Sequence, residues 1–568
     1  MKETKKLNSI LLYIAIIVTS IVMFVFIGQK NGWHEDEIFS YGSSNYKYDN
    51  LFLRFGDKDS LNQLIDEKII GKDIGETIKN ISYYINNKDE FNEELNKKIA
   101  EEKPIWKTKE QAKEYMTVSS DEIFNYWSVY YNQSRDVHPP LFYMLVHLVS
   151  SICLNTFTKY IIFAINLIFY IASCFVLRKI LKLFNKENLS WITVIFYGLS
   201  MGMISIVMFQ RMYMMLTFFA MMYLYLNIKI FKNSFEIDKK TKRWLTLTVI
   251  LGFLTQYYFC IYAVLVAIIS VICMIKNKKW DSLKRYIWCH VKAAIIGIVL
   301  FPASIYHIFF SYRGAAGGVA EGSYWSRLQE YLKLVFYGFS IPEALGYIVI
   351  GILIAMFTRR IISSKRKDIA LLICLPIAIF ICVIAKIAPF INIRYISIVF
   401  PIIVIAVELG ILSSVKEMMK IINKEKIPQF ISKNAGIIVV AIISVISSGY
   451  GLAKSKPEFL YTDYSKRIEL AEQYSKLKFV YIGQSPFNHL QDMEEFLRYD
   501  NSIIVNTWEL DRLKEIYGLD ENTEFILNIK CWVSDFDKTL KDVLKYTGAK
   551  DYELLLDDGQ SRVYKVRK

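Results

Sequence analysis

The chain has 568 residues, of which 54% are hydrophobic, and its mean hydropathy is +0.27. These values exceed those of ordinary soluble domains, so the composition excludes a soluble globular protein and indicates a polytopic membrane protein. The formal net charge is +15. In a membrane protein such an excess of Lys and Arg marks cytoplasmic loops, and it does not require a nucleic-acid partner.

Apolar runs recur along the chain, and each is long enough to cross roughly 30 Å of hydrocarbon as a helix. The first run, Leu7 to Gly28, follows the basic tail Lys2, Lys5 and Lys6. A cleaved signal peptide is the alternative here, but the run exceeds the usual signal length and no small-x-small site follows, which favours a retained anchor. Eleven spans are predicted near residues 8–28, 159–178, 189–209, 211–229, 244–260, 261–276, 288–310, 341–358, 368–388, 395–414 and 435–452.

Basic clusters alternate along the chain with connections that contain little Lys or Arg. This alternation predicts that the clusters and the N-terminus are cytoplasmic, and that residues 29–158 and the C-terminal region lie outside. A span at Leu141 to Leu154 would place the Arg178-Lys179 cluster outside. That stretch is too short for a span and carries His147, so we expect a juxtamembrane helix at the outer surface.

The predicted fold is an α-helical polytopic membrane protein with about 11 transmembrane helices and a small C-terminal extracytoplasmic α/β domain. Residues 1–452 form the membrane domain, whose first external loop, 29–158, contains a strongly charged, solvated insertion between residues 50 and 115. In residues 453–568, strand-like runs at 479–482, 503–505 and 525–527 alternate with three amphipathic helical runs at 490–499, 510–517 and 536–546. Cys531 is the only cysteine of that region and has no disulfide partner there.

Acidic residues are concentrated shortly after the first span, in the sequence Glu35-Asp36-Glu37. Such a cluster repels itself unless a cation, a positive side chain or a shared proton relieves the repulsion. Either these are solvated interfacial acids, or a carboxylate serves as a general base or binds a divalent ion. A near-copy, Asp121-Glu122, follows two serines and fits the first turn of a capped helix, so we prefer Asp36 as the chemical acid.

A second motif, Asp136-Val137-His138-Pro139-Pro140, precedes the juxtamembrane stretch. Pro139 favours extended geometry at His138, and Pro140 is suited to begin the following helix. The motif is therefore a rigid helix entry, and the same rigidity is suited to present Asp136 and His138 to a site shared with Asp36. There His138 would bind a phosphate or orient an acid.

Three arginines lie at or near outer span ends, namely Arg211, Arg313 in a glycine-rich loop, and Arg394. An arginine at membrane depth is costly unless it is paired or reaches the headgroups. The alternative to such snorkelling is a clamp on a lipid-linked phosphate, which a guanidinium matches in geometry and charge. Lys386 either adds to the same positive pocket or snorkels.

These motifs resemble the GT-C superfamily of polyprenyl-phosphate-sugar glycosyltransferases, in particular the protein O-mannosyltransferases and their bacterial relatives. The resemblance covers most of the membrane part but not the C-terminal domain, and the insertion between Glu37 and Asp136 departs from the family pattern. The matching residues are Asp36-Glu37-x-x-Ser40, Asp136-Val137-His138-Pro139-Pro140-Leu141-Phe142-Tyr143, Gln210-Arg211-x-Tyr213, and Arg394-Tyr395 leading to Pro401.

The resemblance implies an inverting hexosyl- or pentosyltransferase at the outer face of a bacterial plasma membrane. Asp36 would be the general base on an acceptor hydroxyl, with Glu37, Asp136 and His138 in the same catalytic site. The donor phosphate would be bound by Arg211, Tyr213, Arg394, Tyr395, Arg313 and Lys386. The high content of Lys, Ile and Asn is typical of an AT-rich genome and fits a Gram-positive bacterium that uses undecaprenyl phosphate.

The expected partners are a polyprenyl-phosphate sugar donor, membrane lipids, and an acceptor that is a glycan, a lipid or a protein. No cofactor is assigned; a divalent cation would be bound by Glu35, Asp36 and Glu37, or none is required. The alternative function is a transporter or flippase of lipid-linked saccharides. A transporter would be expected to contain internal repeats and charged residues near the bilayer midplane. In this sequence the charged residues gather at the outer face and no repeat is visible.

Overall fold

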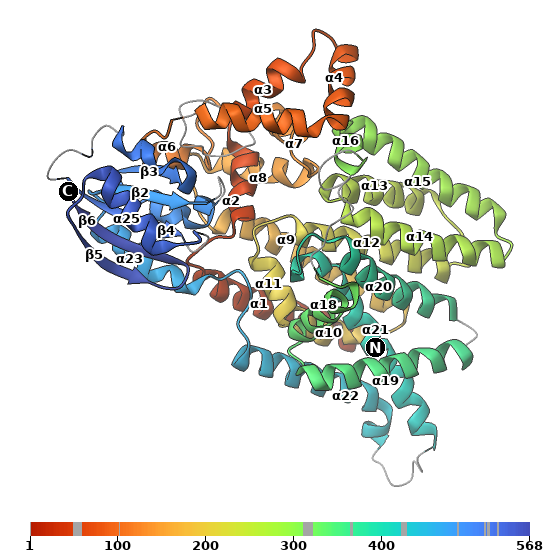
Figure 1. Cartoon of the computed structure of the whole chain (residues 1–568). Coiled ribbons are helices and arrows are strands. Elements are labelled where there is room, and N and C mark those ends of the chain that lie inside the picture. The colour runs from red at the N-terminus through yellow and green to blue at the C-terminus, as the bar shows by residue number, and fades with distance from the viewer. Residues whose placement is uncertain are drawn as a thin grey trace. The chain divides into compact units, whose positions relative to one another are not determined.

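The computed structural model describes residues 2–48, 60–101, 103–309, 322–363, 367–421, 429–484, 488–515, 519, 523–530 and 533–568. The chain forms two compact units (Figure 1). The first, which we call the helical unit, contains Met1–Gln29, Gln133–Leu145 and Lys159–Leu460. The second, the mixed unit, contains Lys30–Asn132, Val146–Thr158 and Tyr461–Lys568. The predicted domain boundary near residue 453 stays a prediction.

Long apolar helices make up the helical unit. Seven of the described helices are long and apolar enough to cross a membrane, which confirms a multi-pass membrane protein. They are α1 (Lys2–Gly28), α9 (Tyr160–Leu183), α12 (Tyr213–Lys232), α14 (Tyr258–Lys276), α20 (Lys367–Ile387), α21 (Val399–Ile421) and α22 (Gln429–Lys454).

Three further helix pairs meet the same criteria of length and apolar composition only if each bent pair counts as one span, which gives up to ten spans among the described residues. The bend is 67° between α10 (Ser190–Gly198) and α11 (Met201–Met208). It is 106° between α15 (Trp280–Leu300) and α16 (Ala303–Phe309), and 96° between α18 (Tyr324–Gly338) and α19 (Glu343–Ser363). The remaining predicted span, near residues 244–260, corresponds to α13 (Lys239–Thr255), which has 17 residues and a basic first turn.

The sequence explains two of these bends. Ser200 caps the N-terminus of α11, because its side chain accepts a hydrogen bond from Met203 N. It therefore starts a new helix where the pattern predicts one continuous span. Pro302 lies between α15 and α16 and cannot donate the backbone hydrogen bond that a continuing helix would need.

The close packing of three helices in the helical unit depends on the small size of Gly198. A Cβ atom at Gly198 would lie 2.0 Å from the hydroxyl oxygen of Tyr170. That hydroxyl donates to Thr19 Oγ1 at 2.7 Å. Glycine at residue 198 thus lets α1, α9 and α10 meet around one buried hydrogen bond.

The mixed unit is built on a six-stranded sheet with the order β1-β3-β2-β4-β6-β5. The central strands are parallel, as in an α/β domain, and the outer ones pair antiparallel. Their bounds are β1 (Lys107–Thr108), β2 (Lys478–Gly483), β3 (Asn501–Asn506), β4 (Glu524–Lys530), β5 (Asp551–Asp557) and β6 (Ser561–Arg567). The C-terminal α/β prediction is confirmed, and the short edge strand β1 shows that the first loop contributes to the same sheet.

The three predicted strand runs are β2, β3 and β4, whose central residues are buried as expected for parallel strands covered on both faces. The predicted helical run near residue 540 is α25 (Phe536–Thr547). The other two runs are mainly short 3₁₀ segments, Asn488–Asp492 and Thr507–Lys514, beside the one-turn helix α24 (Met493–Phe496). The β5–β6 hairpin was not predicted.

The remaining helices of the mixed unit belong to the first loop and the segment before β2. The insertion carries the polar helices predicted for a solvated region. The bounds are α2 (Glu35–Asn45), α3 (Ser60–Lys68), α4 (Ile74–Asn86), α5 (Lys88–Glu101), α6 (Lys109–Glu114) and α23 (Ser465–Gln473). Two further helices, α7 (Tyr126–Ser134) and α8 (Leu141–Ile152), each contain residues of both units.

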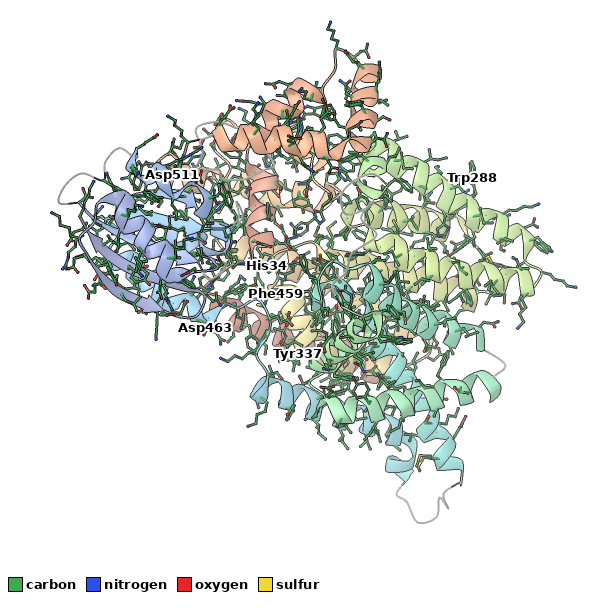
Figure 2. All side chains as sticks on the ribbon, in the orientation of Figure 1. His34, Trp288, Tyr337, Phe459, Asp463 and Asp511 are labelled. Carbon is green, nitrogen blue, oxygen red and sulfur yellow. The ribbon has the colours of Figure 1, made fainter. Side chains whose placement is uncertain are left out.

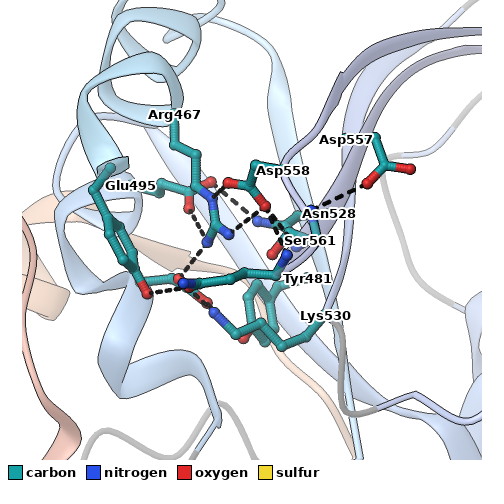
Figure 3. Close-up of polar contacts among 12 residues, drawn as sticks. Arg467, Tyr481, Glu495, Asn528, Lys530, Asp557, Asp558 and Ser561 are labelled. Atoms are coloured by element: carbon teal, nitrogen blue, oxygen red, sulfur yellow. Dashed lines mark hydrogen bonds and ion pairs between the residues drawn. The ribbon is translucent and has the colours of Figure 1, made fainter. Parts of the chain in front are cut away.

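A buried ionic network lies at the centre of the C-terminal part of the mixed unit (Figure 3). The guanidinium of Arg467 binds both carboxylate oxygens of Asp558, at 2.6 and 2.8 Å, and Asp492 Oδ1 at 2.8 Å. Asp492 also accepts from Lys530 Nζ at 2.8 Å. Burial raises the pKa of the nearby Glu495 to about 8, so at neutral pH two cations face two carboxylates.

We predict that Arg467→Ala strongly destabilises the protein, by about 3–5 kcal/mol, because it leaves buried carboxylates without their cation. The matched control is Arg562→Ala, which removes a partly exposed arginine of β6 that pairs with Asp557 at 2.9 Å. That control should cost at most about 1 kcal/mol. Thermal unfolding of the purified full chain measures both, and equal effects would contradict the structural role of the network.

Candidate functional site

Three of the predicted site residues form a line of polar contacts in the helical unit. His138 Nδ1 lies 2.8 Å from Asp136 Oδ2. On the other side of the ring, His138 Nε2 lies 3.4 Å from Arg211 Nη2. His138 and Arg211 are both buried. The structure therefore brings together two motifs that are far apart in the sequence.

The chemistry of these contacts determines the state of the imidazole. A guanidinium only donates hydrogen bonds, so the contact with Arg211 requires that His138 Nε2 carries no proton. His138 is then neutral, and its Nδ1–H donates to Asp136. The carboxylate selects the tautomer, and the imidazole orients the guanidinium, which keeps its positive charge.

Local structure explains why these groups meet. The helix α8 begins at Leu141, directly after the two prolines, as the motif predicts. Arg211 lies in the short break between α11 and α12, where its backbone N–H donates to Phe209 O at 2.8 Å. Asn166, buried in α9, donates to Val207 O and Phe209 O and so satisfies carbonyls at the end of α11.

The second predicted arginine lies in the same region of the helical unit. Arg394 belongs to the 3₁₀ turn Ile393–Ile396, and Arg394 Nη2 donates to Tyr395 Oη at 3.1 Å. Its guanidinium lies 5.4 Å from the centre of the Phe209 ring and 4.9 Å from that of Tyr395, a cation–π geometry. Tyr213 packs edge-on against Tyr395 at 6.2 Å. Arg211, Tyr213, Arg394 and Tyr395 thus surround the end of α11, and we call these four residues with Phe209 the arginine site.

The other two predicted cations are Lys386 and Arg313, and neither is assigned to the arginine site. Lys386, near the end of α20, has an exposed side chain, and its place in a positive pocket stays a prediction. Arg313 lies outside the described residues. The short α8, with 12 residues, is compatible with the expected juxtamembrane helix, whose orientation also stays a prediction.

The structure adds residues that the sequence analysis missed. Arg327 in α18 is buried and donates from Nε to Ala385 O at 2.8 Å and from Nη2 to Ala388 O. Tyr331 donates to Phe390 O at 2.9 Å. Together they fix the backbone that leads from α20 to Arg394. No local motif marks these residues, because their partners are carbonyl groups of a distant segment.

Asp36 and Glu37 belong to the mixed unit, in the first turn of α2. Glu37 Oε2 accepts from Lys30 Nζ at 2.8 Å and from His34 N at 2.8 Å, with both charged side chains almost fully buried. The His34 side chain in turn accepts from Asp36 N at 3.0 Å, which completes a capping box with histidine as the N-cap. The predicted self-repulsion of the acids is relieved by Lys30 and by the helix N-terminus.

These contacts give the two acids different environments. Burial lowers the pKa of Lys30, and the adjacent Glu37 carboxylate opposes that shift. Glu37 is thus engaged in holding the start of α2. Asp36 is 19% exposed, and its Oδ2 lies 3.7 Å from His34 Nδ1. A partly exposed carboxylate on a fixed helical turn has the properties that a general base requires.

The near-copy Asp121-Glu122 folds differently from Asp36-Glu37. Ser119 Oγ donates to Asp121 Oδ1 or Glu122 Oε2, each at 2.6 Å, and Ser119 N also donates to Glu122 Oε2, so a local cap forms. The expected helix does not follow, because Phe124 has a φ of 56° and residues 120–124 are turns and a bend. Asp121 is 72% exposed and serves as a matched control for Asp36.

Among the described residues, no group of three or more His, Cys, Asp or Glu side chains has an arrangement suited to hold a metal ion. Glu35, Asp36 and Glu37 share one helical turn, but Glu37 is directed to Lys30.

Comparisons with known proteins place the fold. No family model matches the chain, and no curated protein matches it in sequence. The crystal structure of ArnT from Cupriavidus metallidurans bound to undecaprenyl phosphate aligns with a TM-score of 0.50 at 11% identity, over 97% of this chain and 97% of that one. This likeness confirms the predicted polytopic GT-C fold and extends through the C-terminal segment that the motif resemblance left out.

Two further structures align less well. The apo state of ArnT from Cupriavidus metallidurans has a TM-score of 0.44 at 11% identity, over 75% of this chain and 87% of that one. The Archaeoglobus fulgidus oligosaccharyltransferase tethered to an acceptor peptide has a TM-score of 0.36 at 10% identity, over 75% of this chain and 65% of that one.

We predict that Glu37→Gln lowers the stability of the protein by about 3–5 kcal/mol, because it removes the carboxylate beside the buried charge of Lys30. The control is Glu67→Gln, which breaks the exposed pair with Lys98 at 3.0 Å and should cost less than about 1 kcal/mol. Thermal unfolding of the purified chain compares the two. An unchanged midpoint for Glu37→Gln would show that the Lys30–Glu37 pair does not stabilise α2.

Proposed function

We propose that this protein is a membrane glycosyltransferase that moves a sugar from a polyprenyl-phosphate-linked donor to an acceptor hydroxyl. The observation that carries the proposal is the arginine site, where two buried arginines lie near the end of α11 and one of them, Arg394, lies over the rings of Phe209 and Tyr395. A phosphate is the anion that two guanidinium groups suit best, and the apolar rings suit the first units of a lipid chain. The fold likeness to a structure with undecaprenyl phosphate bound supports the same class of donor.

The arginine site would act mainly on the leaving group. As the bond between the anomeric carbon and the phosphate oxygen breaks, negative charge builds up on the polyprenyl phosphate. Fixed guanidinium groups in surroundings of low dielectric stabilise such charge without reorganising at the moment of reaction. Asp136 and His138 would act as positioning residues, because they orient Arg211 and leave it charged.

Asp36 would act on the acceptor. Its carboxylate takes the proton of the acceptor hydroxyl while that oxygen attacks the anomeric carbon, and the bond to phosphate breaks with its electron pair leaving on the lipid phosphate. A single displacement of this kind inverts the configuration at the anomeric carbon. Glu37, through Lys30 and His34, would keep α2 and hence Asp36 in place.

The proposed setting is the outer face of a bacterial plasma membrane, with the N-terminus in the cytoplasm and undecaprenyl phosphate as the lipid. The sugar is a hexose or a pentose, and the acceptor is a glycan, a lipid or a protein. Basic clusters alternating with less basic connections support this orientation.

We predict that Asp36→Asn lowers the transfer rate by roughly 10²–10⁴-fold, the usual contribution of a general base, while the fold is retained. The measurement is transfer of radiolabelled sugar from synthetic polyprenyl-phosphate donors to a membrane extract. Asp121→Asn, which alters the exposed near-copy, should transfer like the wild type. Near-normal transfer by Asp36→Asn would remove Asp36 from its proposed role.

We predict that Arg394→Ala weakens donor binding by about 1.5–3 kcal/mol, the value of a hydrogen bond to a charged group, and leaves acceptor affinity almost unchanged. Binding of a non-hydrolysable donor analogue to the purified protein measures the first quantity. Lys333→Ala, which removes an exposed cation of the helical unit, is the control. An unchanged donor affinity for Arg394→Ala would exclude the phosphate clamp.

A further inference from the structure

A short segment after α22 packs against the arginine site within the helical unit. Glu458 N donates to Ser205 Oγ in α11 at 3.0 Å. The neighbouring Phe459 ring stacks on Phe209 with ring centres 4.1 Å apart. Phe209 is the same ring over which Arg394 lies at 5.4 Å. The segment is therefore part of the wall of the arginine site, although no motif in the sequence points to it.

A third contact fixes this segment from another helix. Tyr337 in α18 donates its hydroxyl to Lys456 O, and Tyr337 and Phe459 both appear as labelled side chains in Figure 2. With Ser205 on α11 and Phe209 at its end, the backbone on either side of Glu458 is held at three points. A carboxylate on so constrained a segment keeps a defined position relative to Arg394.

The charge environment of Glu458 is unusual for a glutamate. Burial raises the pKa of its carboxyl to about 7, while the positive charge of Arg394 acts in the opposite direction. The charged and titratable groups that act on it are Arg394 from the 3₁₀ turn and Tyr337 from α18, while Ser205 in α11 accepts from its backbone N–H. Near neutral pH the carboxyl therefore exchanges its proton at little cost in free energy.

We propose that Glu458 is a further residue of the donor site, which counters the charge of Arg394 before the donor binds and takes up a proton when the donor phosphate arrives. This inference rests on the proposed function. An anion that reaches Arg394 also approaches the Glu458 carboxylate, and the repulsion between them is removed when a proton from solvent binds Glu458. The negative charge of the Glu458 carboxylate is thereby replaced by that of the donor phosphate.

The sign of the resulting pH dependence follows from linkage. A bound phosphate raises the pKa of Glu458 further, so the complex binds more protons than the free protein. Donor affinity then increases as the pH falls from above neutrality toward 6, and the gain is complete once the carboxyl of the free protein is protonated. Because only one proton is linked to binding, the donor affinity changes by at most about tenfold per pH unit.

The test measures the dissociation constant of a polyprenyl-phosphate sugar for the purified full chain between pH 6 and pH 8. This donor is a phosphodiester with one charge across that range, so the pH dependence belongs to the protein. We expect the wild type to bind at least about threefold more tightly at pH 6 than at pH 8. Glu458→Gln, which imitates the protonated acid, should bind at both values as the wild type does at pH 6.

Two further variants separate this role from a structural one. Glu458→Asp keeps a titrating carboxyl and should retain a pH slope. Glu343→Gln, which removes an exposed acid of the same unit, should keep the slope of the wild type. A flat wild-type profile, or an unchanged slope in Glu458→Gln, would overturn the inference while donor binding stands. Absence of donor binding at every pH in the wild type would instead reject the proposed function together with it.

Discussion

A charge in apolar surroundings must be compensated, and this constraint organises the helical unit. The charge of Arg211 is compensated through its contact with His138, which in turn contacts Asp136. Arg394 interacts with the rings of Phe209 and Tyr395 and with the charge of Glu458. Both arginines lie where helices are interrupted, between α11 and α12 and between α20 and α21. Buried side chains donate to backbone carbonyls beside both breaks: Asn166 to those at the end of α11, and Arg327 to those at the end of α20.

The same constraint shapes the mixed unit by another route. Lys30 and Glu37 form a buried pair that fixes the first turn of α2, and Arg467 lies in a network in which cations and carboxylates balance. In the first turn of α2, Glu37 is buried against Lys30, whereas Asp36 stays partly exposed. The buried partners raise stability less than their number implies, because each had to lose its hydration, but they specify one arrangement of the chain.

The sequence predicted the fold class, the strands β2 to β4 and four of the five residues of the arginine site, because each has a local signature: long apolar runs, buried β-branched runs and short motifs. It did not predict the bends at Ser200 and Pro302, since hydropathy averages over a cap and a single proline. It also missed Phe209, Arg327 and Glu458, whose partners lie on distant elements and leave no spacing to recognise. The sequence predicted a site that Asp136 and His138 share with Asp36, and this stays a prediction. The contact of His138 with Arg211, and the tautomer that it requires, were not predicted and became apparent only from the geometry.

The most direct test of this account is the fate of the donor in sealed vesicles that contain the purified wild-type protein. The donor would carry a radiolabelled sugar on a synthetic polyprenyl phosphate, with a membrane extract as the source of acceptor. The account predicts that free polyprenyl phosphate appears in step with label on the acceptor, and that the new glycosidic bond has the opposite anomeric configuration. Intact donor that merely moves from one leaflet to the other, with no polyprenyl phosphate released, would contradict a glycosyltransferase and favour a flippase.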